Sequence, residues 1–439
     1  IDVSAYGNTA HAIAFTEAPL VHKPGGFVDF ASAVKQSVNI PVIGVGRIEP
    51  EAAEKAIKNG DFDFFGMGRK LLADPELPNK LTANTPAAIR PCIYCYICVS
   101  EIFINQPMCC AVNHNVGREW EGDLLATDSQ VKKILVVGAG PGGLEAARLL
   151  AEQGHSVSLW EKERDLGGTA RIAALAYAPN EALIDYLADA VRKLPIDLRT
   201  GTTATAETIN AGGYDHIIIA TGAKRTAPQI PGKSQQHVFD GNELRGVLFG
   251  DDPAAAAKLS GFARLMLYAG RVSQLLRSIR LMRLLSRFWM PLADDIVIIG
   301  GGLVGLELAE YLVERRRRIT VLEPGPELGA ELSIVRRARV LHQLGEHGVN
   351  IVRNADITAI ESSSVHYSAD GESAAVEGKQ VIIALGAQPD NGLETQLRTL
   401  AISGTIHTIG DCRHIGYIDG AILDAREVVK VITSSTVTE

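Results

Sequence analysis

Two stretches of the chain follow one plan, and this internal repeat limits the fold more than any other feature of the sequence. The stretches are residues 132–162 and 294–324. Each contains a short strand rich in β-branched residues, a G-x-G-x-x-G turn, an amphipathic helix, a second strand and an acid. A strand that passes through such a turn into a helix is the context of a dinucleotide-binding βαβ unit. The repeat therefore predicts an α/β protein with two such units.

The glycines and acids occupy equal positions in the two units. The glycines are Gly138, Gly140 and Gly143 in the first unit, and Gly300, Gly302 and Gly305 in the second. Glu161 and Glu323 each follow the last glycine by eighteen residues. The first two glycines let the backbone approach a pyrophosphate, the third lets the helix pack on the strand, and the acid accepts hydrogen bonds from ribose hydroxyls. We predict that all eight residues bind cofactor, because two glycine turns with only a structural role are not expected to be followed by an acid at the same spacing.

The second unit favours one nicotinamide coenzyme. Glu323 is followed by "PGPELGAELSIV", which contains no basic residue before Arg336. A 2′-phosphate would meet negative charge there. We therefore expect NADH, with NADPH as the alternative.

Three further strand ends fit nucleotide binding. Residues 216–225 and 381–390 each end a strand in a small-x-Gly turn, and residues 407–412 end a strand at Gly410 and Asp411. A carboxylate in that place is suited to the ribityl or pyrophosphate region of a flavin; the alternative is an exposed turn acid. The additional cofactor-binding residues predicted here are Gly168, Thr221, Gly222, Gly410 and Asp411.

Five of the six cysteines are crowded between positions 92 and 110. Cys92, Cys95 and Cys98 are spaced C-x2-C-x2-C, and Cys109 and Cys110 follow. Zinc sites usually use two separated pairs, whereas three thiolates at intervals of three suit a cubane iron–sulfur cluster with a fourth ligand from nearby chain. We predict a 4Fe–4S cluster. Structural zinc and redox-active thiols are the alternatives, and the spacing allows either of the last two cysteines as fourth ligand.

The first 91 residues show a repeating βα pattern. Residues 1–5, 41–46 and 63–68 read as strands, and residues 49–60 as a helix. Two glycine–arginine pairs, Gly46-Arg47 and Gly68-Arg69, follow consecutive strands. In a (β/α)8 barrel the loops after strands 7 and 8 often build a phosphate site, and arginine is suited to bidentate phosphate contact. We predict a phosphate site at these four residues rather than two surface arginines.

Length and charge exclude several classes of protein. A chain of 439 residues is too long for one ordinary core, so two or three domains are expected. A net charge of -8 argues against nucleic acid as a partner. No apolar run reaches the roughly 18–20 residues that span a bilayer, and no signal peptide is visible. We expect a cytoplasmic protein.

One basic segment stands apart from the repeats. Residues 253–293 contain no acid but carry the arginines 264, 271, 277, 280, 283 and 287. Leu275, Leu276, Ile279 and Met282 recur at helical spacing and predict an amphipathic basic helix. We expect helices packed on the second nucleotide domain, with arginines facing solvent or neighbouring acids. A partner surface and an anionic membrane surface are the alternatives, and membrane contact is not expected.

Together these residues resemble the multidomain old yellow enzyme family of bacterial 2,4-dienoyl-CoA reductases, enoate reductases and trimethylamine dehydrogenase. The matching stretches are "GVGRIEPEAAEKAI", "FGMGRKLLADPEL", "RPCIYCYIC", "CAVN", "GAGPGGLEAARLLAEQGH" and "IGDC". The resemblance implies an FMN-binding (β/α)8 barrel, an iron–sulfur loop, and two nested Rossmann-like domains for FAD and NAD(P)H. In the family the last cluster ligand precedes x-x-Asn. Because Cys110 precedes Ala-Val-Asn, it is favoured over Cys109, so the implied metal ligands are Cys92, Cys95, Cys98 and Cys110.

The resemblance also sets domain limits. It implies the end of a barrel at 1–91, an iron–sulfur loop and linker at 92–130, an FAD domain at 131–235 and 388–439, and an NAD(P)H domain at 236–387 that carries the insert 253–293. Only barrel strands 6–8 would be present, and three strands cannot close a barrel. An upstream polypeptide or a missing N-terminal segment is then expected to complete it.

The family resemblance implies an NADH-dependent ene-reductase. Electrons would pass from NADH to FAD, to the cluster and to FMN, which reduces an activated C=C bond of a 2-enoate or 2,4-dienoyl-CoA-like substrate. His11 aligns with a catalytic histidine that helps protonation, although a plain loop histidine is the alternative. An amine dehydrogenase, in which the first nucleotide domain holds ADP, and an electron-transfer subunit remain alternative functions. Self-association into a homo-oligomer is also open.

Overall fold

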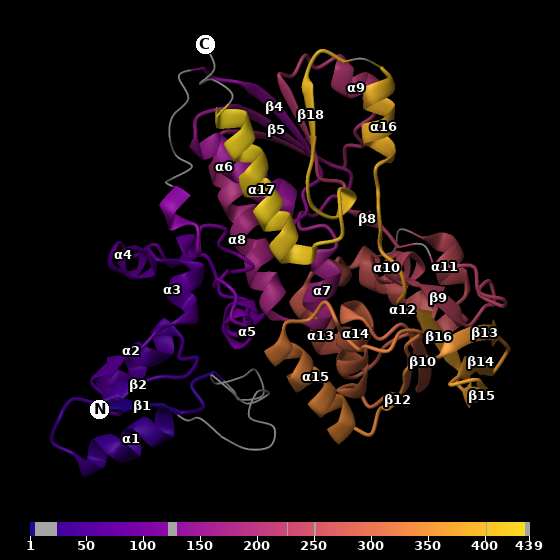
Figure 1. Ribbon diagram of the computed structural model, residues 1–439, viewed down its shortest axis with the longest axis horizontal. Helices are drawn as coiled ribbons and strands as arrows, with labels where there is room; N and C mark the ends of the chain where they lie inside the picture. Colours follow the sequence, from indigo (N-terminus) through magenta and orange to yellow (C-terminus); the bar gives the residue numbers. More distant parts are fainter. Residues whose placement is uncertain (5–23, 122–129, 226, 250–251, 401, 435–439) are drawn as a thin grey trace. The chain divides into compact units, whose positions relative to one another are not determined.

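The structure is a computed structural model that describes residues 1–4, 24–121, 130–225, 227–249, 252–400 and 402–434. These residues form two compact units. The first comprises residues 1–117 with 333–342, and the second comprises residues 118–332 with 343–439. Figure 1 labels the helices and strands of both.

The first unit contains a three-stranded parallel sheet in the order β1-β2-β3. The strands are β1 (Asp2–Val3), β2 (Ile43–Gly44) and β3 (Phe64–Phe65). Ala31, Val42 and Phe62 are among the buried side chains of the core beside this sheet. The three strands expected from the sequence are confirmed, and each is shorter than the apolar run that predicted it.

Five short helices complete the first unit. They are α1 (Val28–Ser37), α2 (Pro50–Asn59), α3 (Arg69–Ala73), α4 (Leu77–Thr82) and α5 (Ile97–Phe103). Helix α2 begins with a proline, which suits a first-turn position that needs no N–H. It ends at Gly60, whose left-handed backbone lets its N–H bond the last carbonyls. The predicted helix at 49–60 is confirmed.

The second unit contains two five-stranded sheets in which all paired strands run parallel. The first sheet has the order β18-β7-β4-β5-β6 and the second β12-β11-β10-β16-β9. The bounds of the first are β4 (Lys133–Val137), β5 (Ser156–Glu161), β6 (Ile196–Thr200), β7 (His216–Ile219) and β18 (Thr405–Thr408). Those of the second are β9 (Val238–Asp240), β10 (Asp295–Ile299), β11 (Arg318–Leu322), β12 (Asn350–Val352) and β16 (Gln380–Ile383). The two predicted βαβ units are therefore confirmed.

Helices cover the sheets of the second unit. Helix α17 (Tyr417–Ser434) runs beside α6 (Pro141–Glu152) on the first sheet (Figure 1). Residues 142–151 of α6 are all buried, because the helix lies between the sheet and α17. The remaining helices of the unit outside the insert are α7 (Ala170–Ala176), α8 (Pro179–Lys193), α9 (Ala206–Asn210), α10 (Gly241–Phe249), α14 (Leu303–Val313) and α16 (Gly392–Thr399). Helix α15 (Ile334–Glu346) begins within the segment that belongs to the first unit.

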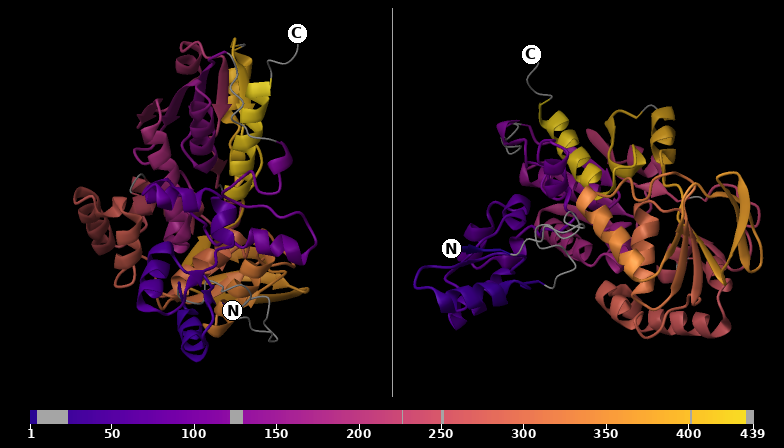
Figure 2. Two further views of the ribbon diagram at one scale, coloured as in Figure 1. Left: turned by 90° about the vertical axis from the view of Figure 1, so that its left-hand side faces the viewer. Right: turned by 60° about the horizontal axis from the view of Figure 1, so that its bottom comes forward.

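Two smaller sheets flank the parallel ones. β13 (Asp356–Ile360), β14 (Ser364–Ala369) and β15 (Glu372–Glu377) form an antiparallel meander that stands at the edge of the second nucleotide domain in the right view of Figure 2. β8 (Ala223–Lys224) pairs with β17 (Gln388–Pro389). This pair joins the two stretches of chain that connect the five-stranded sheets. The domain limits predicted near it remain predictions.

The basic insert forms several helices. They are α11 (Pro253–Ala257), α12 (Gly261–Val272) and α13 (Ile279–Leu285), with a 3-10 turn at Leu275–Arg277. The expectation of one helix through residues 275–282 is wrong, because Ser278, between the 3-10 turn and α13, has an extended backbone with φ of -87° and ψ of 112°. Among the described residues, no helix has the length and apolar character needed to cross a membrane.

Candidate functional site

The two glycine turns sit at the carboxyl ends of β4 and β10. Gly138 has φ of 102° and Gly300 has φ of 112°, a region that residues with a side chain rarely adopt. A Cβ on Gly138 would lie 2.4 Å from the carbonyl oxygen of Ala220, and one on Gly300 would lie 2.7 Å from that of Ala384. Both positions therefore require glycine.

The third glycine of each motif sets the contact between helix and strand. A Cβ on Gly143 would lie 1.9 Å from the oxygen of Gly138, and one on Gly305 would lie 1.8 Å from the oxygen of Gly300. The close helix–strand packing predicted from the motif is present in both units.

The middle glycines, which begin the helices, differ between the units. Gly140 is the N-cap of α6, and an added Cβ would meet no atom within 4 Å. The space before this helix N-terminus is open, as an anion site requires. Gly302 is the N-cap of α14, where a carboxylate oxygen of Glu331 accepts a hydrogen bond from the Leu303 N–H at 3.1 Å. The sequence analysis missed Glu331, which occupies the place where the motif puts a pyrophosphate.

Glu161 and Glu323 bind the backbone of their own turns. Glu161 accepts hydrogen bonds from the N–H groups of Ala139 (2.6 Å) and Glu163 (2.9 Å). Glu323 accepts them from Gly301 and Gly325, both at 2.6 Å. Each acid thereby fixes the residue between the first two glycines of its motif. Contact with a ribose remains a prediction for both.

The other residues predicted for the first nucleotide site lie around the open end of α6. Gly168 has φ of 51°, and a Cβ there would lie 3.1 Å from the Cα of Gly140. The adjacent residue, Gly167, donates a hydrogen bond to the carbonyl of Ala139 at 2.8 Å. This backbone therefore borders the same space as the glycine turn.

The strand ends near this site are held by side chain to backbone contacts. Thr221 donates to the carbonyl of Asp390, and Gly222 has φ of 78°. Gly410 has φ of 66° and donates to Asp424 at 2.8 Å. Asp411 accepts hydrogen bonds from the N–H groups of Gly416 and Tyr417, both at 3.0 Å. Asp411 is therefore not a free turn acid, and its predicted contact with a flavin stays a prediction.

Arg47 and Arg69 lie against two tyrosines of the cysteine loop. The Cζ of Arg47 is 4.6 Å from the ring centroid of Tyr94, and the Cζ of Arg69 is 4.6 Å from that of Tyr96. Gly46 precedes Arg47 and has φ of 115°, whereas Gly68 is the N-cap of α3. The four residues predicted at the phosphate site thus lie beside the cysteine loop, and their role as phosphate ligands remains a prediction.

The cysteine loop is shaped by two residues with left-handed backbone. Tyr94 has φ of 53° and Tyr96 has φ of 64°, and α5 starts immediately afterwards. The Tyr94 N–H points to the sulfur of Cys92 at 3.4 Å. The backbone N–H of Ile97 likewise lowers the pKa of Cys95, and that of Val99 lowers the pKa of Cys98. The loop therefore aims N–H donors at its sulfurs.

Electrostatic interaction links the four predicted ligand thiols. Burial raises the pKa of Cys92 and Cys95, and raises that of Cys98 to about 11. A charge on one thiol also raises the pKa of its neighbours, and this coupling includes every pair among these three residues and Cys110. The four cysteines favoured by the resemblance therefore lie near enough to influence one another's charge, and their role as cluster ligands remains a prediction.

These residues fit an iron–sulfur cluster. Four neighbouring thiols disfavour one another's charged form, so bound iron would supply the positive charge that stabilises thiolates. The N–H donors aimed at the sulfurs are a second feature that such clusters use. In the part of the chain that the structure describes, no three His, Cys, Asp or Glu side chains are grouped closely enough to hold a single metal ion.

A distant stretch of the chain buttresses the cysteine loop within the first unit. Ser333 donates its hydroxyl to the carbonyl of Cys95 at 2.7 Å, and the Val335 N–H donates to Ser100 at 3.2 Å. Val335 also packs on Tyr94 and Tyr96. The sequence carries no signal for this contact, because the paired residues are 238 and 235 positions apart.

The candidate catalytic residue His11 lies outside the described residues. Its assignment rests on the sequence alone.

Two family models cover most of the chain. The model of the pyridine nucleotide-disulphide oxidoreductases matches residues 132–413. The model of the NADH:flavin oxidoreductase / NADH oxidase family matches residues 10–87. The first covers both glycine turns, and the second covers both glycine–arginine pairs.

Individual relatives match almost the full chain. It is 32% identical to the NADH oxidase of Thermoanaerobacter brockii, over 93% of this chain and 58% of that protein. It is 27% identical to the cinnamate reductase of Clostridium sporogenes, over 94% of this chain and 56% of that protein. A solved complex of 2-naphthoyl-CoA reductase superimposes with a TM-score of 0.81 at 28% identity, covering 95% of this chain and 58% of that one. The chain thus spans little more than half the length of these relatives.

Proposed function

The chain belongs to the pyridine nucleotide-disulphide oxidoreductases and, with its NADH:flavin oxidoreductase segment, to the multidomain old yellow enzyme family, and on this premise we propose that it serves in the NADH-dependent reduction of an activated C=C bond. The substrate class is a small unsaturated carbonyl compound or acyl-CoA thioester. A cytoplasmic location is part of the same proposal.

Each nucleotide unit has a role in this proposal. The open N-terminus of α6, bordered by Gly140 and Gly168, would hold the pyrophosphate of FAD. The turn at Gly300, fixed by Glu323, would hold NADH. Glu331 at α14 must then turn away from the Leu303 N–H, because the pyrophosphate needs the same donor.

The first unit would hold the remaining groups. Cys92, Cys95, Cys98 and Cys110 would bind a 4Fe–4S cluster, and Arg47 and Arg69 would bind the phosphate of FMN. When bound, NADH supplies a hydride, flavins exchange electrons in pairs or singly, and an iron–sulfur cluster carries single electrons.

The protein's own contribution is placement and charge. Arg69 opposes the rise in the pKa of Cys92 and Cys98 that burial causes, so its guanidinium favours the thiolate form needed for iron. Ser333 and the left-handed residues Tyr94 and Tyr96 hold the loop backbone in place. His11 stays the candidate for supplying a proton to the substrate.

The observation that carries the proposal is the proximity of the two arginines to the cysteine loop. Arg47 and Arg69 contact Tyr94 and Tyr96, which alternate with the ligand cysteines along the chain. On this proposal a flavin phosphate site adjoins a cluster site, as an enzyme that passes electrons between the two groups requires. The names of two relatives, cinnamate reductase and 2-naphthoyl-CoA reductase, support the substrate class.

The test is an anaerobic assay of the purified protein after reconstitution with iron, sulfide, FMN and FAD. We expect NADH oxidation that depends on a conjugated 2-enoate or 2-enoyl-CoA and yields the saturated acid or thioester. Oxidation of a secondary amine without enoate reduction would instead identify an amine dehydrogenase. NADH-dependent dye reduction alone would identify an electron-transfer subunit.

A further inference from the structure

The acid-free insert uses some of its arginines to attach to the first nucleotide domain. Arg277 pairs with Asp165 at 2.7 Å, and Arg283 pairs with Glu181 at 3.0 Å. Ile279 and Met282 are buried beside Ala174 of helix α7. One side of the insert is therefore held to the fold by both charge and packing.

The insert also exposes large apolar side chains. Along α12, Phe262, Leu265, Tyr268 and Val272 recur at helical spacing and are each more than 60% exposed. Ala263 and Leu267 of the same helix are buried in the core below. Leu284 and Phe288 add two further side chains, exposed to 51% and 83%. We call these six exposed residues the apolar face; scattered single apolar residues are normal on a surface, but this concentration of large apolar side chains on one insert indicates an interaction site.

Arginines accompany the apolar face without acids to balance them. Arg264 and Arg287 are exposed, and neither has an ion pair within the described part of the chain. No acid occurs between Asp252 and Asp294. The face is thus apolar and positively charged on a chain whose net charge is -8.

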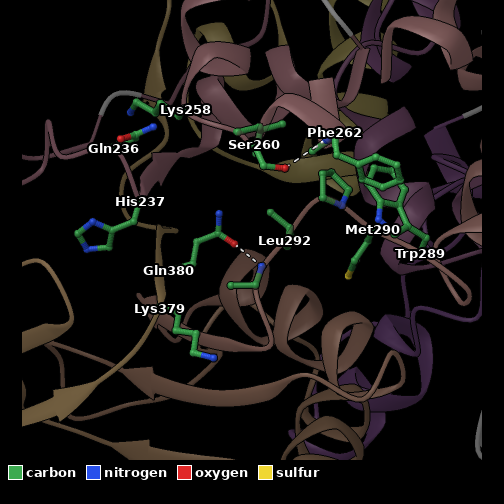
Figure 3. A pocket seen from close by; sticks show the side chains of 14 residues that line it. Gln236, His237, Lys258, Ser260, Phe262, Trp289, Met290, Leu292, Lys379 and Gln380 are labelled. Atoms are coloured by element: carbon green, nitrogen blue, oxygen red, sulfur yellow. Dashed lines mark hydrogen bonds between the residues drawn. The ribbon is translucent and has the colours of Figure 1, made fainter. Parts of the chain in front are cut away.

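A groove borders this face. Its volume is about 540 Å³, and Phe262 and Trp289 stand together at one end, with ring centroids 6.0 Å apart and planes at 89° (Figure 3). Lys258 and Lys379 line other parts of the same groove. In the left view of Figure 2 the insert helices project from the side of their domain. Lys258 pairs with Glu243 and Lys379 with Asp295, so the two rings are the feature of the groove that suits the boundary between headgroups and acyl chains.

We propose that the insert, residues 253–293, docks the protein on the surface of an anionic phospholipid bilayer, with the apolar face at the acyl boundary and Arg264 and Arg287 among the headgroups. Interfacial helices combine an apolar face of aromatic and aliphatic side chains with arginines or lysines on the adjoining polar face. A second copy docked face to face would bring arginine against arginine with no acid between them. Charge complementarity therefore favours the lipid surface.

The experiment is flotation of the purified, cofactor-loaded protein with vesicles of phosphatidylcholine alone or of phosphatidylcholine mixed with phosphatidylglycerol. The protein floats with the mixed vesicles at low salt and much less at physiological ionic strength, where charges are screened over about 8 Å. It does not float with phosphatidylcholine alone. Equal binding to both vesicles, or binding to neither, overturns the proposal.

Two double variants separate the apolar and the charged contributions. Phe262→Ser with Phe288→Ser lowers binding at least about tenfold, because each ring loses its apolar contact. Arg264→Gln with Arg287→Gln lowers it about thirtyfold, since each basic residue near an anionic surface contributes about fivefold. Trp120→Ser is the matched control, because Trp120 is 83% exposed and lies outside the insert. It leaves binding unchanged.

Circular dichroism and NADH-dependent dye reduction show whether each variant folds and keeps its basal activity, which none of these residues serves. Unchanged vesicle binding by folded Phe262→Ser/Phe288→Ser protein overturns the proposal. So does light scattering that shows a dimer which this variant abolishes, because the face would then be an interface between copies of the chain.

Discussion

The guanidinium carbon of Arg69 lies 4.6 Å from the ring centroid of Tyr96, which follows Cys95 directly in the C-x2-C-x2-C motif. The arginine also lowers the pKa of Cys92 and Cys98 against the effect of burial. A residue predicted from its place after a barrel strand is therefore also part of the environment of the cysteines. The positive charge of Arg69 therefore acts on the predicted cluster site as well as on the predicted phosphate site.

Replacing Arg69 by glutamine removes this charge from the cysteine loop. Because the thiolates then lose one of their nearby cations, with Lys70 remaining, we expect less iron per chain after reconstitution and a cluster midpoint potential about 60 mV more negative, which corresponds to ~1.4 kcal/mol. Iron analysis and an anaerobic redox titration measure the two effects. Lys58→Gln is the control, since Lys58 pairs with Glu54 on the exposed surface of the same unit. An unchanged potential in folded Arg69→Gln protein contradicts the assignment.

The fourth ligand is tested by exchanging neighbouring cysteines for serine. Cys110 interacts electrostatically with all three cysteines of the C-x2-C-x2-C motif, so Cys110→Ser is expected to lose the cluster's visible absorption and most of its iron. Cys109→Ser is expected to retain both. The reverse result would make Cys109 the ligand.

Two acids of the second nucleotide unit have opposite expected effects on NADH. Glu323→Gln weakens the hold on the Gly301 N–H and removes the charge that opposes a 2′-phosphate, so KM for NADH rises about tenfold and the preference over NADPH shrinks. Glu331→Gln weakens the acceptor that competes for the Leu303 N–H, so KM for NADH falls. Steady-state kinetics with a dye acceptor measure both constants. A rise in KM for Glu331→Gln would show that this acid supports coenzyme binding.

The sequence predicted those parts of the site that depend on local geometry. Gly138 and Gly300 are recognisable because a turn with positive φ excludes a side chain wherever it occurs. The support of the cysteine loop by Ser333 was not predictable, because it joins residues 238 positions apart. The insert departs from the expected helix at Ser278, where one residue with an extended backbone interrupts a run whose apolar spacing continues.

A pair of histidines in the first five-stranded sheet predicts a pH dependence of stability. The ring nitrogens of His216 and His407 lie 3.1 Å apart, and burial, followed by the charge of His216, lowers the pKa of His407 from 6.5 to about 4. In the unfolded chain His407 takes up its proton near pH 6.5, whereas in the folded chain it does so only near pH 4. The free energy of unfolding therefore falls as the pH drops from 6.5 to 4, by about 1 kcal/mol after solvent screening.

Urea unfolding at several pH values measures this slope. In His407→Gln the slope across that interval becomes shallower, because the titrating ring is gone. His347→Gln is the control, since His347 is exposed on another part of the same unit, and its slope is expected to match that of the unaltered protein. Equal slopes in all three proteins would contradict the prediction.

Two alanine substitutions separate the structural from the binding role of the first glycine motif. In Gly143→Ala the new Cβ would lie 1.9 Å from the Gly138 oxygen, so α6 must move and the free energy of unfolding falls by about 3 kcal/mol.

In Gly140→Ala the Cβ meets no protein atom within 4 Å, and the extended backbone there, with φ of -73° and ψ of 179°, suits alanine. Its stability without flavin therefore stays within about 1 kcal/mol of the unaltered protein. Its FAD content after reconstitution nevertheless falls, because the methyl group fills the space before the helix N-terminus. Urea unfolding of the flavin-free protein and flavin analysis by chromatography test the two variants. A Gly140→Ala protein that retains full FAD would contradict the assignment of the pyrophosphate to this turn.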